Sequence, residues 1–319
     1  MRRTRKRKQK AKIIAKAAVK LSPYVLIFTL GTGAIVDYFL EEYKSQLAYE
    51  NLADDLTNDN STIEEPIEIN PVIEHIPIIE EEIPEEKQEE IPEEVIEEVY
   101  STDLLDMGYE FKNIDFEELN QINEDSVGWI ELKDTVIDYP IVQGEDNDYY
   151  LHNDINGNSS KNGTIFQDVR DSAIGSEELS DLSVLYGHHM ASGAMFAGIC
   201  NYKNPNYVND HPFAVIYGED GSVYQAEFFA GQVISGESDD GLYVYQFNSE
   251  QEFDDYIERL KENSTFDTNV ELEYGDKILA LVTCSYETNN SRYVLYARLS
   301  RQYTNYEEIN ESNNYTRSL

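Results

Sequence analysis

The chain has 319 residues and a formal net charge of −39 at pH 7, but the charge is distributed unevenly. The first 20 residues carry ten Lys or Arg side chains and no Asp or Glu. A basic head can bind nucleic acid, but here it leads directly into an apolar run, which argues against a nucleic-acid partner. We interpret residues 1–20 as a basic cytoplasmic head.

The apolar run covers residues 21–40 and contains a single charged side chain, Asp37. About 20 mostly apolar residues span a bilayer as a helix. Basic residues before the run and acidic residues after it place the N-terminus in the cytoplasm and the rest of the chain outside. A cleaved signal peptide is the alternative, but the run is long for one and no small-x-small motif follows it. The sequence therefore predicts an uncleaved transmembrane signal anchor in a single-pass membrane protein.

Residues 41–100 carry 21 Asp or Glu side chains and two Lys side chains. An acidic phrase with proline repeats within them, as in Ile79-Glu-Glu-Glu-Ile-Pro84. Proline interrupts helices and like charges repel, so the sequence predicts an extended, disordered segment. We interpret it as a spacer that holds a folded domain away from the membrane, with a specific binding segment as the alternative.

Residues 101–303 are long enough to form one domain with a substantial core. A helix is predicted over 116–123, with Leu119 and Ile122 on its apolar face. Eight short β-like runs follow, separated by turn signals, which indicates a barrel or a sandwich. The polar tail, 304–319, is expected to be frayed. The runs are 128–133, 135–142, 163–167, 182–187, 212–218, 222–235, 277–284 and 292–299.

Two further helices are predicted, over 194–202 and over 249–261. The second has apolar residues at i, i+3, i+4 and i+7, a face that we expect to pack on the sheet. Ser249 and Glu252 form a candidate capping box at its start. The apolar face comprises Phe253, Tyr256, Ile257 and Leu260.

The strand predicted over 277–284 ends in Cys284, and the next strand opens with Arg292. Neighbouring strands joined by a short turn place the thiol and the guanidinium at the same end of a sheet. A thiolate is a strong nucleophile, and a fixed cation lowers the pKa of a thiol and stabilises an oxyanion. Cys284 is therefore a candidate nucleophile, with a buried core cysteine as the alternative. Cys200 lies in an apolar helical pattern, and we interpret it as a core residue outside any disulfide.

The paired His188 and His189 supply the proton carrier that acyl transfer needs. Adjacent strand residues face opposite sides, so the pair divides between the two faces, and the pattern alone leaves both open for the acid–base role. His152 is a third candidate, although its context is more typical of a site wall. His211 precedes a proline and is interpreted as a turn residue.

No metal or cofactor is expected. Two adjacent histidines and one distant cysteine lack the spacing of zinc ligands. The segment 154–158 faintly resembles a calcium loop, but Ser159 and Ile165 stand where the loop needs glycine and glutamate. A papain-like protease places its cysteine before its histidine, whereas here His188 precedes Cys284.

Three blocks, Tyr186-Gly-His-His-Met190, Leu281-Val-Thr-Cys284 and the downstream Arg292, resemble the signature blocks of sortases, and in particular of class B sortases. The resemblance covers most of residues 108–302. Two departures bear on substrate detail: the loop from cysteine to arginine is shorter than in some class B members, and Val282 stands where some carry a hydroxyl. Further matching blocks are Val127–Ile130, Thr135–Val142, Tyr149–His152 and Asn162–Asp168.

The resemblance implies a mainly β fold. It is a closed, sortase-type eight-stranded barrel with an N-terminal helix, an extra helix before the catalytic-cysteine strand and a separate transmembrane helix. It also implies a membrane-anchored cysteine transpeptidase of Gram-positive bacteria with an extracellular catalytic domain. Such an enzyme cleaves the C-terminal sorting signal of a surface protein through a thioester. It then transfers the acyl group to the amine of a lipid II-type cell-wall precursor or of a pilin.

By this resemblance Cys284 is the nucleophile, His188 is the acid–base because it follows the glycine directly, and Arg292 holds the substrate backbone or the oxyanion. The alternative function is a surface-anchored binding protein on an acidic stalk, with an inert cysteine. The reactivity of the Cys284 thiol distinguishes the two. Residues expected to contact the substrate are Leu151, Thr283 and Ser285.

Overall fold

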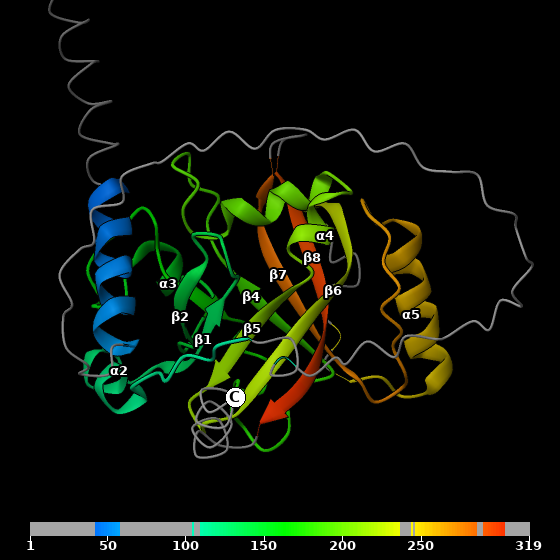
Figure 1. The fold of residues 1–319 in the computed structure, drawn as a ribbon, viewed down its shortest axis with the longest axis horizontal. Coiled ribbons are helices and arrows are strands. Elements are labelled where there is room, and N and C mark those ends of the chain that lie inside the picture. The colour runs from blue at the N-terminus through cyan, green and yellow to red at the C-terminus, as the bar shows by residue number, and fades with distance from the viewer. Residues whose placement is uncertain are drawn as a thin grey trace, which may run out of the picture.

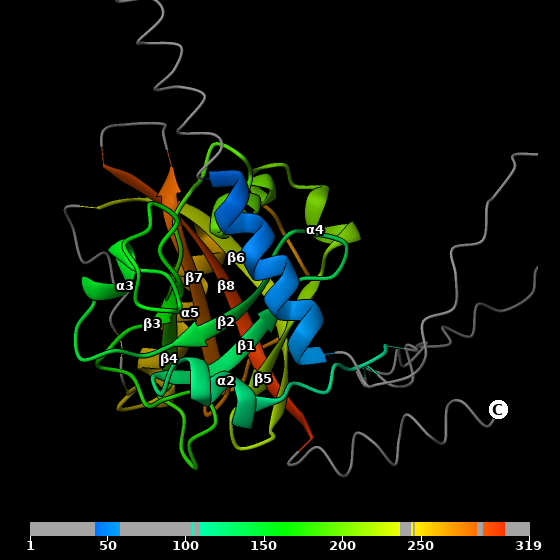
Figure 2. The ribbon, with the colours of Figure 1, turned by 90° about the vertical axis from the view of Figure 1, so that its left-hand side faces the viewer.

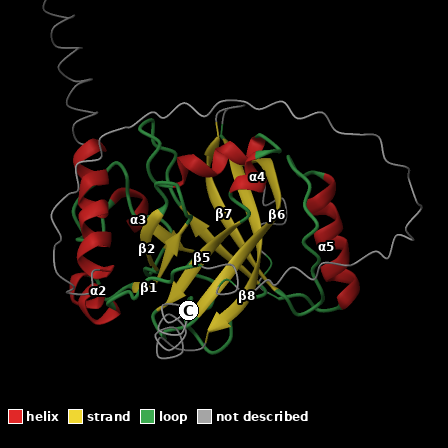
Figure 3. Ribbon diagram, viewed as in Figure 1, coloured by secondary structure: helices red, strands yellow, loops and turns green. Residues whose placement is uncertain are grey.

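A β-barrel forms the centre of the structure. The computed structural model describes residues 42–57, 104, 109–236, 244, 246–285 and 290–303. Within these residues eight strands close into a barrel in the order β1-β2-β3-β4-β7-β8-β6-β5 (Figure 3). Each strand corresponds to one of the eight predicted runs, so the predicted closed barrel is confirmed. The strands are β1 (Ser126–Glu131), β2 (Asp138–Val142), β3 (Ile165–Gln167), β4 (Leu182–Tyr186), β5 (Phe213–Gly218), β6 (Val223–Ser235), β7 (Lys277–Ser285) and β8 (Ser291–Tyr303).

The wall formed by β4, β7 and β8 is buried on both faces, which explains why these strands are almost continuously apolar. Leu279 and Leu281 of β7 point into the main core of the barrel. Ile278, Ala280 and Val282 point to the other face and pack in a second core with the α5 helix. We call this second side, which α5 covers, the outer face of the wall.

Several helices surround the barrel, and α5 is the one that follows β6 and precedes the cysteine-bearing β7. Ser249 caps α5 by accepting a hydrogen bond from the backbone N–H of Glu252 (3.2 Å). The Glu252 carboxylate accepts from the backbone N–H of Asn248 (2.9 Å), so the reciprocal bond of the predicted capping box closes one residue early. The helices are α2 (Phe116–Ile122), α3 (Tyr149–His152), η1 (Phe196–Lys203), α4 (Tyr207–Asp210) and α5 (Glu250–Glu262).

The segment predicted as a helix over 194–202 forms the 3-10 helix η1. Its large buried side chains, Phe196, Ile199 and Tyr202, are spaced three residues apart. A 3-10 helix repeats every three residues, so this spacing keeps all three side chains against the barrel.

Residues 42–57 also form a helix, where the sequence predicted a spacer from residue 41 onward. The helix lies across the barrel on the side opposite α5 (Figures 1 and 2). Its side chains Tyr49, Ala53 and Leu56 are buried in the main core. These apolar residues recur at helical spacing, and their burial stabilises the helix against the repulsion of its acidic side chains. The spacer prediction is therefore wrong for residues 42–57.

The end of this helix is tied to the domain. The carbonyl of Leu56 accepts a hydrogen bond from the backbone N–H of Asp115 (3.2 Å). Leu104 is buried in the same core. Residues 57 and 104, on either side of the acidic segment, therefore both adjoin the domain. The helix at 42–57 is the first part of the described chain that packs on the domain.

The remaining predicted segments lie outside the described residues. They are the basic head 1–20, the apolar run 21–40, most of the acidic segment and the tail 304–319. In the part of the chain that the structure describes, no helix has both the length and the apolar character needed to cross a membrane.

Candidate active site

The strand register brings the predicted catalytic residues to one end of the wall. Cys284 of β7 is the direct cross-strand partner of Arg292 of β8. Opposite residues of an antiparallel pair share a face, so their side chains start from the same side of the sheet. On the other edge of β7, Tyr186 of β4 pairs in parallel with Val282. His188 follows two residues after Tyr186, so we expect its side chain to leave the chain on the same side as that of Cys284.

This face is the outer one. Val282, two residues before Cys284, belongs to the core under α5. Tyr186, two residues before His188, is partly buried and packs against both cores. Cys284 lies beyond the edge of that core and is exposed, and it forms no disulfide with Cys200. The alternative interpretation of Cys284 as a buried core residue is thus wrong, because residue 284 is exposed to solvent.

His188 is held by the backbone of α3. Its Nε2 lies 2.8 Å from the carbonyl oxygen of Leu151. A carbonyl oxygen only accepts, so Nε2 carries a proton and Nδ1 is left as the nitrogen that can exchange one. Leu151, predicted to contact substrate, therefore touches the proton carrier through its main chain.

His189 has a different environment from its neighbour. Its Nδ1 lies 2.8 Å from the carbonyl oxygen of Cys284 and donates to it. The Sγ of Cys200 lies 3.5 Å from the same Nδ1. Cys200, interpreted from sequence as core, is half-buried beside this ring. The structure thus separates the two histidines, because His189 uses its ring to bind the backbone of the candidate nucleophile.

The guanidinium of Arg292 lies against Asn290 and Gly236. Its Nη1 donates to the side-chain oxygen of Asn290 (3.2 Å). It lies so close to Gly236 that a Cβ there would stand 1.5 Å from Nη1. Gly236 directly follows β6, which lies on the far side of β8 from β7. The register places Arg292 beside Cys284, while the side chain rests over the end of β6.

The other residues predicted to contact substrate are placed differently. Thr283 is 2% exposed, and its hydroxyl donates to the carbonyl oxygen of Gly187 (2.8 Å). It faces into the barrel and ties β7 to the chain leaving β4. The side chain of Ser285 lies outside the described part of the chain.

The turn after the paired histidines is supported by the helix at 42–57. Glu42 Oε1 accepts from the backbone N–H (2.9 Å) and the hydroxyl (2.7 Å) of Ser192. The hydroxyl of Tyr139 donates to Gln46 Oε1 (2.9 Å) and accepts from the backbone N–H of Met195 (3.2 Å). Sequence reasoning missed these residues because it assigned the helix to the spacer.

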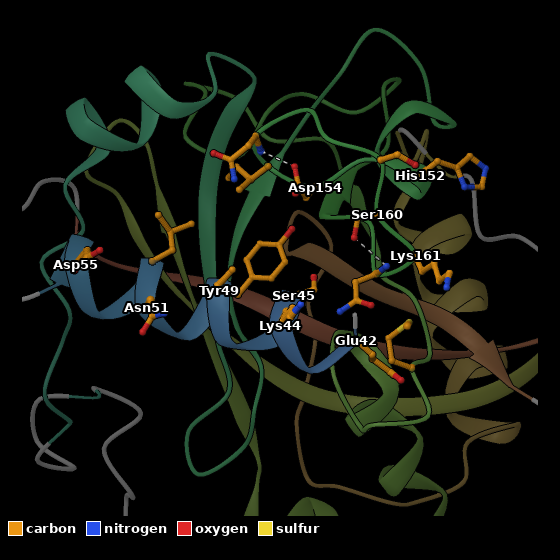
Figure 4. Close-up of a pocket in the computed structure, with 17 residues that line it drawn as sticks. Glu42, Lys44, Ser45, Tyr49, Asn51, Asp55, His152, Asp154, Ser160 and Lys161 are labelled. Carbon is orange, nitrogen blue, oxygen red and sulfur yellow. Dashed lines mark hydrogen bonds between the residues drawn. The ribbon is translucent and has the colours of Figure 1, made fainter. Parts of the chain in front are cut away.

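A cavity of about 900 Å³ lies between the helix at 42–57 and the segment 152–162 (Figure 4). His152 lines it. In the suggested calcium loop, Asp154 Oδ1 instead accepts from the backbone N–H groups of Asn156 (3.0 Å) and Asn158 (2.9 Å), as in an Asx turn. Among the described residues, no group of three or more His, Cys, Asp or Glu side chains is arranged to hold a metal ion.

A closed barrel that carries an exposed thiol, a histidine and an arginine at one end of its wall has the parts for covalent acyl transfer. The sequence profile of the sortase domain matches residues 130–300. Sortase B of Listeria monocytogenes serovar 1/2a is 34% identical over 188 residues, which cover 58% of this chain and 74% of the relative.

Solved structures agree. A Staphylococcus aureus sortase B–substrate complex matches with a TM-score of 0.54 and 28% identity, over 58% of this chain and 84% of that one. A sortase B complexed with triglycine matches with a TM-score of 0.53 and 29% identity, over 58% and 85%. The chain therefore belongs to the sortase family, and within it is a cysteine transpeptidase of the sortase B type.

Proposed function

We propose that this transpeptidase cleaves the C-terminal sorting signal of a surface protein through a thioester on Cys284, and then passes the acyl group to an amine. The observation that carries the proposal is the strand register, which pairs Cys284 with Arg292 and sets Tyr186, two residues before His188, beside Val282. The similarity to a sortase B in complex with substrate and to one in complex with triglycine supports both halves of the reaction.

The reaction has two steps. In the first, the Cys284 thiolate attacks a backbone carbonyl carbon of the sorting signal, the C–N bond breaks, and His188 donates a proton to the leaving amine. In the second, the acceptor amine attacks the thioester and loses a proton to His188, and the thiolate leaves. The protein ends in the state in which it began.

The Leu151 carbonyl prepares His188 for this exchange. It fixes the proton on Nε2, so that Nδ1 accepts and donates the transferred proton. A carbonyl oxygen also stabilises the imidazolium that is present before the first step and again after the second, by the logic that a third group orients an acid–base histidine.

Arg292 would act after a change of rotamer. The bound substrate offers carbonyl oxygens and a developing oxyanion, to which the planar guanidinium can donate two hydrogen bonds. Its contact with Asn290 involves a neutral oxygen, which a negatively charged oxyanion can displace. We infer that Arg292 leaves its place over Gly236 when the substrate binds.

Membership of the sortase family also supports a proposal for the acceptor and for the cellular location. We propose that the acceptor is the amine of a lipid II-type cell-wall precursor or of a pilin. We also propose that residues 21–40 anchor the chain in the cell membrane, with the N-terminus in the cytoplasm and the catalytic domain outside, in a Gram-positive cell envelope. The basic head and the apolar run support this orientation.

The direct test is transpeptidation in vitro. The full chain in detergent is incubated with a synthetic sorting-signal peptide and triglycine, and the products are identified by mass. We expect the acyl fragment joined to triglycine with the wild-type protein and less than about a hundredth of that product with Cys284→Ala. Equal product from both proteins would remove Cys284 from the reaction. An unreacted thiol after iodoacetamide treatment would instead favour a binding protein with an inert cysteine.

A further inference from the structure

The seam between β4 and β7 separates the proton carrier from the nucleophile. His188 follows β4, and Cys284 lies at the end of β7. The two strands pair in parallel, and the chain after β4 adds one more backbone bond, from the N–H of Gly187 to the carbonyl of Val282 (3.1 Å). The position of the catalytic groups relative to each other depends on how this seam is closed at its end.

A parallel ladder uses every second residue, so the next bond would join the backbone N–H of His189 to the carbonyl of Cys284. The paired register of the two strands ends before this point, at Tyr186 and Val282. His189 forms an isolated bridge with Met195, and the N–H of Phe196 donates to the carbonyl of His188 (3.0 Å). The regular ladder therefore ends one bond short of the nucleophile.

The ring of His189 occupies that position. Its Nδ1 donates to the Cys284 carbonyl at 2.8 Å, a distance as short as a good backbone bond. We propose that His189 is a positioning residue of the reaction. Its ring N–H replaces the missing ladder bond and holds the backbone of Cys284 against the chain that carries His188.

The neighbouring thiol fits this role. The Sγ of Cys200 lies 3.5 Å from Nδ1 of His189 and 4.0 Å from the Cys284 carbonyl oxygen. Cys200 belongs to η1, whose large apolar side chains are fixed in the main core. The sulfur thus packs beside the bond from a rigid element and restricts the rotation of the ring.

The inference rests on the proposed function, because it assigns to His189 the geometry of that reaction. Without the ring N–H, the bonds of Val282 and Thr283 to Gly187 would still hold β7 to the chain after β4, but Cys284 itself would be held less firmly. The distance from the thiol to His188 would then vary. Misplacing a reacting group by about 1 Å can lower a rate by about 100-fold. The loss should appear in kcat, whereas KM should change little because the ring bonds the main chain of Cys284.

The test compares His189→Asn with His189→Asp, whose side chains have the same shape but carry an amide nitrogen and a carboxylate oxygen at the same place. In His189→Asn the amide nitrogen can take the place of Nδ1 and still donate. In His189→Asp an oxygen stands there, which cannot donate and repels the Cys284 carbonyl. A third variant, His189→Leu, removes the polar group at similar size. The full chain in detergent is assayed for peptide cleavage, and alkylation of Cys284 by iodoacetamide is followed against pH by site-resolved mass spectrometry.

We expect His189→Asn to keep kcat within about threefold of the wild type, and His189→Asp and His189→Leu to lose about 10- to 100-fold in kcat with KM nearly constant. Equal kcat for His189→Asn and His189→Asp would overturn the inference, as would a wild-type kcat in His189→Leu. Should the leucine variant fail to fold, the Asn and Asp pair still decides.

Failure of the proposed function is distinguishable from failure of this inference. If the wild-type chain does not cleave the peptide, the proposed function fails, and the alkylation profiles still report on His189. Positioning by the ring predicts that His189→Asp shifts the pH profile of Cys284 alkylation while His189→Asn leaves it in place. Superimposable profiles for all variants would contradict it.

Discussion

The two sides of the barrel wall at the catalytic end differ in what their side chains do. On the outer side, Cys284 is exposed, and Arg292 donates to the turn residue Asn290 and lies over Gly236. On the other side, the hydroxyl of Thr283 binds the Gly187 carbonyl, and the ring of His189 binds the Cys284 carbonyl. Side chains alternate along a strand, so neighbouring residues have different roles here. Cys284 is preceded by Thr283, and His188 is followed by His189, and both of these neighbours fix the backbone. Reactivity and support are thus divided between adjacent residues.

This division predicts that outer-side substitutions lower the rate directly, that His189 substitutions lower it through positioning, and that Thr283 substitutions mainly lower stability. The largest effect is expected for His188→Ala. Loss of the proton carrier should lower kcat by about 100- to 10,000-fold with an unchanged melting temperature. Peptide cleavage and thermal unfolding measured on the same sample check this. If His189→Ala proves to be the more damaged of the two variants, the assignment of faces is wrong.

The next effect tests the guanidinium. Arg292→Lys keeps the charge but loses the planar fork, so we expect kcat/KM to fall by about 10- to 100-fold. Arg301→Lys, near the opposite end of β8, is the matched control and should behave as the wild type. Near-normal kinetics in Arg292→Lys would mean that a surface charge suffices at this position.

The helix at 42–57 tests support from a distance. Leu56 is 3% exposed in the main core, and Leu47 is 40% exposed on the same helix. We expect Leu56→Ala to lower the free energy of unfolding by about 2–4 kcal/mol and Leu47→Ala by less than about 0.5 kcal/mol. Chemical denaturation measures both. Equal effects would indicate that the helix is not docked as described, and would restore a domain that begins near residue 101.

A smaller effect is expected on the inner side of the wall. Thr283→Val keeps the shape of the side chain but removes the hydroxyl that binds the Gly187 carbonyl. Leaving that buried acceptor without its donor should lower the free energy of unfolding by about 1–2 kcal/mol. The kcat should fall less than in any outer-side variant. A loss of kcat as large as that of Arg292→Lys would contradict the division between the two sides.

The last effect concerns the pH dependence of stability and Asp171, which supports β4 by accepting from the backbone N–H of Val184 (2.7 Å). Burial, together with the charge of Asp168, raises the pKa of Asp171 to about 7, against the lowering effects of the Val184 N–H and of Arg170. The folded protein therefore keeps a proton that the unfolded chain loses near pH 4, so this group's contribution to stability falls between about pH 4 and pH 7.

Asp171→Asn should remove that dependence and raise the free energy of unfolding at pH 8 by about 1–3 kcal/mol. Denaturation at a series of pH values measures the slope. Asp254→Asn, on the exposed side of α5, is the control and should leave the slope unchanged. A slope that persists in Asp171→Asn would assign the pH dependence to other groups.

The barrel could be predicted from sequence because each strand carries its own signal. Runs such as Lys277–Ser285 have an apolar centre and are bounded by turns, and α5 repeats its apolar residues at helical spacing. The helix at 42–57 carries a signal of the same kind, since Tyr49, Leu52, Ala53 and Leu56 fall at i, i+3, i+4 and i+7. The strongly acidic composition of the whole segment obscured it.

The site was predictable in its residues but not in its contacts. Cys284, His188 and Arg292 stand at strand ends, which a one-dimensional pattern reveals. The place of the Arg292 side chain depends on Gly236, and the bond of His189 depends on the register of β4 against β7. Contacts between segments so far apart in the chain are set by tertiary packing, which local patterns do not encode.

The central claim, that Cys284 carries the acyl group, is tested most directly by trapping the intermediate. The full chain is mixed with a sorting-signal peptide without acceptor, quenched in acid, digested and analysed by mass spectrometry. The account predicts an acyl adduct on Cys284 that disappears when triglycine is added before the quench. Peptide cleavage with no adduct on Cys284, or with the adduct on Cys200, would contradict it.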